Sequence, residues 1–313
     1  MILALDIGGS FIKAAWSPEP GKLEPIGRIA TPSDSLDAFV SAIVDLTKAA
    51  PSSPQALAIS LTGIVDRDSG RLTCANIPAL HQTILAPALE AALGLPVLIA
   101  NDADCFALAE AARGAGRGRH VVFGVILGSG VGGGLVSGGR LVNSAGGYAG
   151  EWGHGAFLPA VAGDPPERIP AFECGCGRKG CLNTVGGARG LEALHRHLHG
   201  TNADSHAILA AWEADDPAAA RTVDIYSDLV ARLLALAINI TGAEIAPVGG
   251  GLANSEKLLS NIDRKTKPGV LGVSERPLVV QAQCGPDAGL IGAAALGWSM
   301  NADERNSAGS VRG

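Results

Sequence analysis

Apolar positions along the chain follow two spacings, and each spacing predicts one type of element. Short apolar runs at residues 2–7 and 11–16, on either side of a glycine turn, predict a strand hairpin. Between residues 36 and 46, apolar residues recur every three or four positions, which predicts an amphipathic helix. The same reasoning predicts further strands at 56–60, 97–100, 121–127, 245–248 and 278–281, and helices at 103–111, 225–240 and 288–298.

Two stretches without such periodicity suggest where the chain divides. The Gly- and Arg-rich segment 114–119 separates a helix from a fresh apolar strand, and it predicts a domain boundary. The polar segment 301–313 is rich in Ser and Gly, and we expect it to be a disordered tail.

The amino-acid composition favours one structural class and argues against two kinds of binding partner. Hydrophobic residues make up 47% and charged residues 17%, so a large core is available, and 43 glycines with 4% aromatics suit an α/β protein with tight ligand loops. The net charge of −6 argues against nucleic-acid or anionic-membrane partners. We find neither a transmembrane segment nor a signal peptide and expect a cytoplasmic protein, in which six cysteines act as thiols or metal ligands rather than disulfides.

Three glycine loops, each after an apolar strand, predict phosphate binding. Glycines allow several backbone N–H groups to approach phosphate oxygens closely. In the first loop, Asp6 could hold Mg²⁺ and Ser10 adds a hydroxyl; the others are the GSGVGGG run at 128–134 and the glycines at 249–251. The alternative for any one of them is an ordinary tight turn. The chain contains neither a P-loop motif nor an ordered GxGxxG run that opens a helix.

A cysteine cluster predicts a structural metal site. Cys174, Cys176 and Cys181 lie within eight positions and are spaced by glycines, and His154 just upstream is a candidate fourth ligand. Three cysteines and one histidine form a closed tetrahedral zinc set without an open position for catalysis. The alternative is three free thiols in a surface loop.

Asp102 is the candidate catalytic residue. It stands at the carboxyl end of a predicted strand, where ligand sites of α/β proteins collect. Phosphoryl transfer to a hydroxyl needs such a base near the acceptor. The alternative is that Asn101 and Asp102 merely cap the following helix.

Taken in order, these motifs resemble the ROK family of sugar kinases and related regulators. The resemblance extends from residue 2 to about 298, and its most specific part is AGEWGH followed by CGCGRKGCLN. The motifs are DIGGSFIK from Asp6, TGIVD from Thr62, ANDAD from Ala100, GSGVGGG from Gly128, AGEWGH from Ala149, CGCGRKGCLN from Cys174, VGGGLAN from Val248 and DAGLIGAAALG from Asp287.

The resemblance implies an α/β, actin-like ATPase (ribonuclease H-like) fold, with two domains around a cleft. Residues 1–118, joined by the C-terminal helix 287–300, would form the small domain, and 119–286 the large domain with the zinc knuckle. It also implies ATP, Mg²⁺, structural Zn²⁺, a free sugar and a homodimer, with phosphorylation of an aldohexose or N-acetylhexosamine, commonly at O6.

The resemblance also assigns roles to individual residues. Asp102 would be the general base, and His154 would contact both metal and sugar. The implied sugar-binding residues are Gly63, Asn101, Asp102, Glu151 and His154; the metal ligands are His154, Cys174, Cys176 and Cys181; the phosphate-binding residues are Gly8, Gly9, Ser10, Gly128, Ser129 and Gly130; and Gly250 and Gly251 would border the adenosine.

The sequence departs from the family at two positions. Family kinases usually have a sugar-binding Glu two residues after the last cysteine, where this chain has Asn183, an uncharged residue that both donates and accepts. The residue after the first loop is Phe11, where Lys or Asn is usual. Asn183 leaves the identity of the sugar open.

Three rival functions remain. A sugar-responsive transcription factor would need an N-terminal helix-turn-helix, which we do not expect because the hairpin begins at residue 2. A non-catalytic sugar- or nucleotide-binding protein of the same family is the main alternative and rests on Asn183. An actin-like or chaperone-like ATPase would leave the cysteine cluster unexplained.

Overall fold

The computed structural model describes residues 1–74, 76–144, 146–272 and 275–309. These residues form two compact units. The first comprises Met1–Gly118, Leu135–Ala149 and the segment from Cys284 onward, and the second comprises Arg119–Gly134 and Gly150–Gln283. Within the described ranges, no helix is both long and apolar enough to span a membrane.

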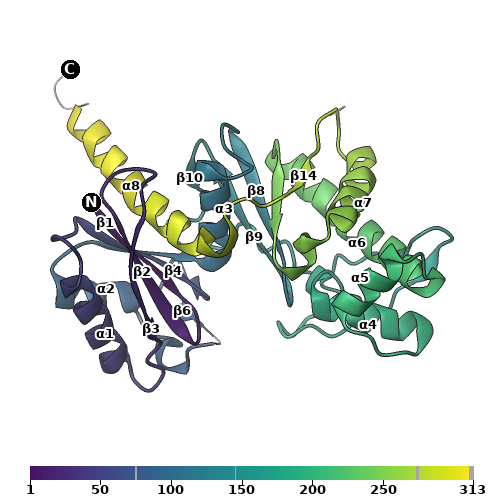
Figure 1. Cartoon of the computed structure of the whole chain (residues 1–313), viewed down its shortest axis with the longest axis horizontal. Helices are drawn as coiled ribbons and strands as arrows, with labels where there is room; N and C mark the ends of the chain where they lie inside the picture. Colours follow the sequence, from purple (N-terminus) through teal and green to yellow (C-terminus); the bar gives the residue numbers. More distant parts are fainter. Residues whose placement is uncertain (75, 145, 273–274, 310–313) are drawn as a thin grey trace. The chain divides into compact units, whose positions relative to one another are not determined.

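The first unit is built on a five-stranded sheet of order β3-β2-β1-β4-β7 (Figure 1). Strands β1 and β2 form the predicted antiparallel hairpin, whereas β1, β4 and β7 run parallel. The strands are β1 (Ile2–Ile7), β2 (Phe11–Ser17), β3 (Glu24–Ala30), β4 (Ala56–Leu61) and β7 (Val97–Asn101); the helices are α1 (Leu36–Lys48), α2 (Leu85–Leu93), α3 (Asp102–Arg113) and α8 (Ala288–Gly309); a small ribbon joins β5 (Ile64–Val65) and β6 (Leu72–Thr73).

Strand β1 is buried on both faces. Because its side chains alternate between these faces, its odd and even positions pack against different helices. Leu3 and Leu5 belong to the core that includes Phe39 of α1, whereas Ile2 and Ala4 belong to the core made with helix α8 (Figure 1, yellow). Since side chains alternate between faces of a strand, the next even position, Asp6, points to the same face as Ile2 and Ala4. The sequence pattern thus directs this carboxylate toward α8.

The second sheet has the order β10-β9-β8-β13-β14, and β13 runs parallel to both β8 and β14. The long helix α6 begins with Pro217 after an Asp216 cap and ends at Gly242, as helix-capping preferences expect. The strands are β8 (Val121–Leu127), β9 (Val131–Ser137), β10 (Arg140–Leu141), β13 (Ala246–Gly249) and β14 (Val279–Gln281), with a ribbon of β11 (Val161–Ala162) and β12 (Glu167–Arg168); the helices are α4 (Ala188–His199), α5 (Ser205–Glu213), α6 (Pro217–Thr241) and α7 (Glu256–Thr266).

Two expectations about chain organisation can be compared with these elements. The first unit also takes in Leu135–Ala149, which the sequence assigned to the large domain. Helix α8 continues to Gly309, through the first part of the segment predicted to be a tail, and residues 310–313 lie outside the described residues.

Candidate functional site

The carboxyl ends of three parallel strands in the first unit bring the predicted polar residues to one edge of the sheet. The strand register pairs Asp6 with Ser60, and Ser60 with Ala100 of β7. The residues that follow these strands, among them Thr62 and Asp102, therefore lie beside the first glycine loop. This is the edge where ligand sites of parallel sheets form.

Asp6 is half-buried, and two groups pack against its carboxylate. The Ser60 hydroxyl donates to Oδ1 at 3.0 Å, and Gly289 of α8 packs so closely that an added Cβ there would overlap the carboxylate. Burial raises the pKa of Asp6 above its usual value, against the opposing effects of Ser60 and Lys13. A bound divalent cation would favour the charged form that burial disfavours.

Asp102 is the first residue of α3 and is held by two donors. The Thr62 hydroxyl donates to Oδ2 at 3.2 Å, and the Ala103 backbone N–H donates to Oδ1 at 2.9 Å. Burial is the largest influence on its pKa and raises it, while both hydrogen bonds act in the opposite direction. A half-buried carboxylate with a raised pKa binds a proton more readily, as a general base requires.

Asn101 and Gly63 contact each other. The Asn101 Nδ2 donates to the Gly63 carbonyl at 2.9 Å, and its Oδ1 accepts from the Ala103 N–H at 2.8 Å. Asn101 is therefore the cap of α3, as the alternative interpretation expected, and it also fixes the turn after β4.

The first glycine loop is a hairpin turn held by main-chain contacts. Gly8 N–H donates to the Phe11 carbonyl at 3.0 Å, and the Thr31 hydroxyl donates to the Gly8 carbonyl at 2.7 Å. Gly9 and Ser10 are exposed at its tip. The Arg28 guanidinium stacks over the Phe11 ring, 3.4 Å from its centroid, and so brings a cation close to the end of this loop.

In the second unit, three glycine segments far apart in the sequence converge. Gly250 has a φ of +91°, and a Cβ there would overlap the Leu127 carbonyl and the N–H of Gly128. Gly187, just before α4, lies so close that a Cβ would come within 2.5 Å of the Gly130 Cα. Only glycine permits these approaches, so the predicted nucleotide loop is packed between two further glycine turns.

A cavity of about 510 Å³ beside this loop is lined by residues of the second unit. Helix α4 supplies Arg189, whose exposed cation lines the cavity together with Ser129 and Gly130. Asn183 lines it as well: its Oδ1 accepts from the Val131 backbone N–H at 2.8 Å.

The predicted metal ligands lie together. The ligand atoms of His154, Cys174, Cys176 and Cys181 all lie within 4.8 Å of one another. Cys176 Sγ lies 3.6 Å from Cys181 Sγ, and Cys174 Sγ lies 3.6 Å from His154 Nδ1. A tetrahedral zinc with Zn–S bonds of about 2.3 Å separates its sulfur ligands by about 3.8 Å, so this donor set fits zinc in both chemistry and spacing.

Electrostatics within the cluster favours thiolate formation at one position. The backbone N–H of Arg178 is the main cause that lowers the pKa of Cys176, to about 6, while burial raises the pKa of Cys181. The His154 Nε2, on the side of the ring away from Cys174, lies 4.0 Å from Glu151 Oε2. A histidine that used Nδ1 for a metal would keep Nε2–H free for a carboxylate or a sugar hydroxyl.

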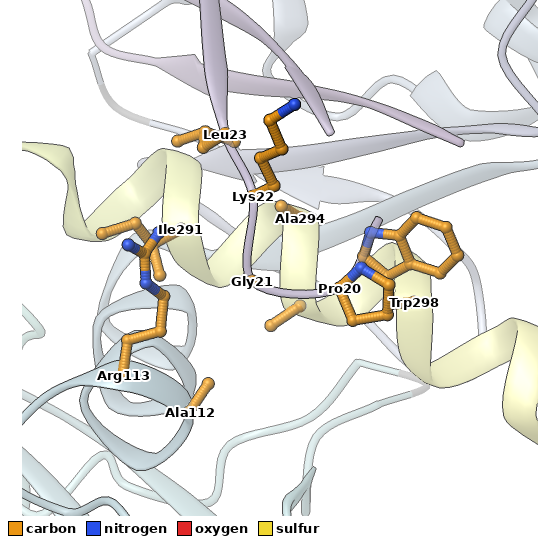
Figure 2. A pocket seen from close by; sticks show the side chains of 10 residues that line it. Pro20, Gly21, Lys22, Leu23, Ala112, Arg113, Ile291, Ala294 and Trp298 are labelled. Carbon is orange, nitrogen blue, oxygen red and sulfur yellow. The ribbon is translucent and has the colours of Figure 1, made fainter. Parts of the chain in front are cut away.

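A separate cavity of about 340 Å³ lies in the first unit, between the turn after β2, the end of α3 and helix α8 (Figure 2). Figure 2 shows Arg113 on one side and Trp298 on the other. The Trp298 Nε1 donates to Ser17 Oγ at 2.9 Å, and Lys22 pairs with Glu24 at 2.8 Å. Its lining is mostly apolar and includes none of the residues predicted for the site.

Within each unit, the structure thus groups the residues that the sequence singled out. Asp6, the first loop, Gly63, Asn101 and Asp102 share one sheet edge in the first unit. The second loop, Gly250, Asn183 and the metal cluster are neighbours in the second. Sequence reasoning assigned no individual role to four of their partners, which are too common in type to signal a site alone: Ser60, Thr62, Gly187 and Gly289.

Comparison with known proteins agrees with this architecture over nearly the whole chain. A model of the ROK family matches residues 2–299. An N-acetylgalactosamine kinase of a Shewanella species is 35% identical over 305 residues, which cover 96% of this chain and 98% of the relative. An N-acetyl-D-glucosamine kinase of Photobacterium profundum is 35% identical over 301 residues, or 95% and 99% of the two chains.

Solved structures give the same result. A ROK hexokinase from Thermus thermophilus superposes with a TM-score of 0.81 at 28% identity, covering 96% of this chain and 99% of that one. A ROK family glucokinase from Streptomyces griseus, in complex with glucose and AMPPNP, gives 0.69 at 27% identity, covering 94% and 98%. The predicted fold class is confirmed: the chain has the actin-like ATPase fold and belongs to the ROK family.

Proposed function

We propose that this chain is an ATP-dependent sugar kinase that phosphorylates a free N-acetylhexosamine or aldohexose at O6. Its family membership and kinase relatives support the reaction class. Both curated relatives described above act on N-acetylated hexosamines, and this favours an N-acetylhexosamine over glucose. The observation that supports the proposal most directly is the half-buried Asp102 at the carboxyl edge of the first sheet.

Asp102 is the proposed general base. As the sugar O6 bonds to the γ-phosphorus of ATP, the bond from that phosphorus to the β,γ-bridging oxygen breaks, and the O6 proton moves to the Asp102 carboxylate. Thr62 and the Ala103 N–H orient the carboxylate from the protein side. ADP and the sugar phosphate then leave, and Asp102 releases its proton to solvent.

The remaining residues bind and orient. Asp6 is proposed to hold Mg²⁺, directly or through water, and the bound ion would neutralise charge on the ATP phosphates. The proposed phosphate contacts are Gly8, Gly9, Ser10, Gly128, Ser129 and Gly130, with Gly250 and Gly251 beside the adenosine; the proposed sugar contacts are Gly63, Asn101, Glu151, His154 and Asn183.

The cysteine cluster is proposed to bind a structural zinc. The Cys₃His set fits a closed tetrahedral site, and a metal there would fix His154 in one orientation. We further propose a homodimer that works in the cytoplasm, where its donor ATP is available.

A coupled ADP-release assay with ATP and Mg²⁺ over a panel of free sugars tests the proposal. We expect ADP release that depends on an N-acetylhexosamine and is weaker with other hexoses. If no sugar elicits ADP, while calorimetry still detects binding of a sugar or of ATP, the non-catalytic binding protein replaces the kinase.

A further inference from the structure

Asn183 joins three parts of the second unit. Its backbone N–H donates to the Gly153 carbonyl at 2.8 Å, in the segment that carries His154. Its side-chain Oδ1 accepts from the N–H of Val131 at 2.8 Å, at the first residue of β9 and directly after Gly130 of the second glycine loop. Its Nδ2 lies 3.8 Å from Cys174 Sγ in the metal cluster.

The donor groups around the side chain determine its orientation. A backbone N–H can only donate, so the Asn183 oxygen must face Val131, and the amide nitrogen must then face the sulfur of Cys174. Rotating the amide by half a turn would place two donors against each other. A cysteine sulfur that binds a metal is a good acceptor for N–H groups, and Gly155 N–H donates to Cys181 Sγ in the same way, at 3.4 Å.

From these contacts we propose that Asn183 is a positioning residue that couples the metal cluster to the second glycine loop. Metal held by the cysteines and nucleotide held by the loop would then stabilise each other through one side-chain amide. The proposal rests on the function assigned above to Gly128, Ser129 and Gly130, and it gives Asn183 a role that does not depend on the sugar.

The composition of the loop explains why an external support matters. The turn between β8 and β9 is Gly128-Ser129-Gly130, so two of its three residues are glycines with wide conformational freedom, and it has no charged side chain that could anchor it. Asn183 Oδ1 approaches so closely that a Cβ on Gly130 would lie 2.5 Å from it. A loop fixed before the nucleotide arrives loses less conformational entropy on binding, which strengthens affinity.

Replacing Asn183 with Asp tests the coupling with almost no change of shape. The carboxylate can still accept from Val131, but its second oxygen cannot donate to Cys174 and would place a negative charge against a thiolate. Asn239→Asp is a matched control in the same unit, because the Asn239 amide also accepts from a backbone N–H and donates to a carbonyl, at Leu271 and Gly269.

Two affinities are measured without sugar: that of Mg-ADP by calorimetry, and that of zinc by competition with a chromogenic chelator. For Asn183→Asp we expect about 5- to 20-fold weaker ADP binding, within the usual range of coupling between sites. We also expect about 10- to 100-fold weaker zinc binding, as for the loss of a group that supports a metal ligand. Asn239→Asp should match the wild type in both affinities.

The wild type alone provides a second test, which holds even if the variant folds poorly. Removing zinc should weaken ADP binding, and ADP should strengthen zinc binding by the same factor, because coupling is reciprocal. In Asn183→Asp this mutual effect should vanish. Zinc and ADP affinities that are independent in the wild type would overturn the coupling but leave the kinase intact. If Asn183→Asp changed only the affinity for sugar, that result would likewise overturn the coupling and leave the kinase intact. Failure of the zinc-loaded wild type to bind ADP at all would instead overturn the function proposed for the loop, and the coupling with it.

Discussion

The two glycine loops follow strands in the same way, yet they differ in how they are held and in what they contribute. The first joins β1 to β2 and lies just after the half-buried carboxylate of Asp6. Contacts within its own sheet, from Phe11 and Thr31, hold it in place. The second follows β8 and contains no charged side chain. Besides a bond from the Gly128 N–H to the Gly130 carbonyl at 3.0 Å, segments distant in the sequence hold it: Asn183, Gly187 and Gly250.

This difference separates two kinds of contribution to one reaction. In the proposed reaction, the carboxylate of Asp6 beside the first loop would supply a side-chain charge, so its effect should depend on Mg²⁺ and on protonation. The second loop would supply backbone N–H groups, so its effect should depend on close packing and on the contacts that fix the loop. Neither loop contains the proposed base, Asp102. Substitutions at the base, at the loops and at the metal cluster test these roles, from the largest expected effect to the smallest.

Asp102→Asn should abolish turnover while both loops still bind nucleotide. Loss of a general base lowers kcat by about 10²- to 10⁴-fold. The affinity for Mg-ADP, measured by calorimetry, should stay within a few-fold of the wild type. Asp37→Asn is the matched control, since Asp37 also lies in the first turn of a helix but is exposed. Turnover of Asp102→Asn near the wild-type rate would exclude Asp102 as the base.

The raised pKa of Asp102 adds a pH dependence with a definite sign. The base must be ionised, so kcat of the wild type should fall as the pH drops through a pKa above that of an ordinary Asp. Since the fold favours the protonated carboxyl, its contribution to stability is present at low pH and is lost as the pH rises through the raised pKa. Asp102→Asn should therefore have an unfolding temperature at neutral pH equal to or above that of the wild type, measured by calorimetry.

Asp6→Asn tests the proposed role of the carboxylate that precedes the first loop. Removing one group that stabilises transition-state charge lowers kcat by about 10²- to 10³-fold. Part of the loss should be recovered at high Mg²⁺, because a neutral amide is a weaker ligand than a carboxylate. Rates measured across a Mg²⁺ titration check this, with Asp45→Asn, at an exposed position of helix α1, as control. An unchanged Mg²⁺ requirement would remove Asp6 from the ion's site.

A pair of glycine substitutions compares the loops directly. A Cβ on Gly130 would lie 2.5 Å from Asn183 Oδ1, whereas a Cβ on Gly8 would meet only the Phe11 carbonyl at 3.7 Å. Gly130→Ala should therefore weaken Mg-ADP binding by about tenfold or more, the equivalent of about 1.4 kcal/mol, and Gly8→Ala by much less. Equal losses in the two variants would show that the loops do not differ in how they are held.

Among these substitutions, Cys176→Ser should change nucleotide binding by the loops the least. We expect loss of bound zinc, a lower unfolding temperature and a modest weakening of Mg-ADP binding that passes through Asn183. Metal analysis, calorimetry and ADP titration check the three effects. Cys284→Ser, outside the cluster, is the control and should keep its metal. A wild type purified without stoichiometric metal, and unable to take it up, would contradict the zinc assignment.

Much of the fold could be predicted from the sequence because local periodicity determines local structure. The hairpin of β1 and β2, helix α1 and the strand before Asp102 lie where the apolar spacing predicted them. The ROK family and the fold class were likewise predicted from the motifs and are confirmed. The roles of individual site residues stay predictions.

Contacts between distant segments could not be predicted in this way. Glu110 is fully buried in α3 and accepts from the Cys284 backbone N–H at 2.7 Å, 174 positions away. Glu110 is flanked by alanines in the sequence, and these neighbours give no indication of a contact with Cys284. Asn183 is similar: the sequence indicates an unusual residue type there, but the bond to Val131 arises only once β9 and the cysteine cluster pack together.

Analysis of the reaction product tests the central claim most directly. The wild type and Asp102→Asn are each incubated with ATP, Mg²⁺ and N-acetylglucosamine, and the product is examined by ³¹P and ¹H NMR. We predict that the wild type yields a sugar monophosphate with phosphorus coupled to the C6 protons, together with one equivalent of ADP, and that the variant yields almost none. Absence of sugar phosphate with this and the other N-acetylhexosamines, or equal yields from both proteins, would contradict the account.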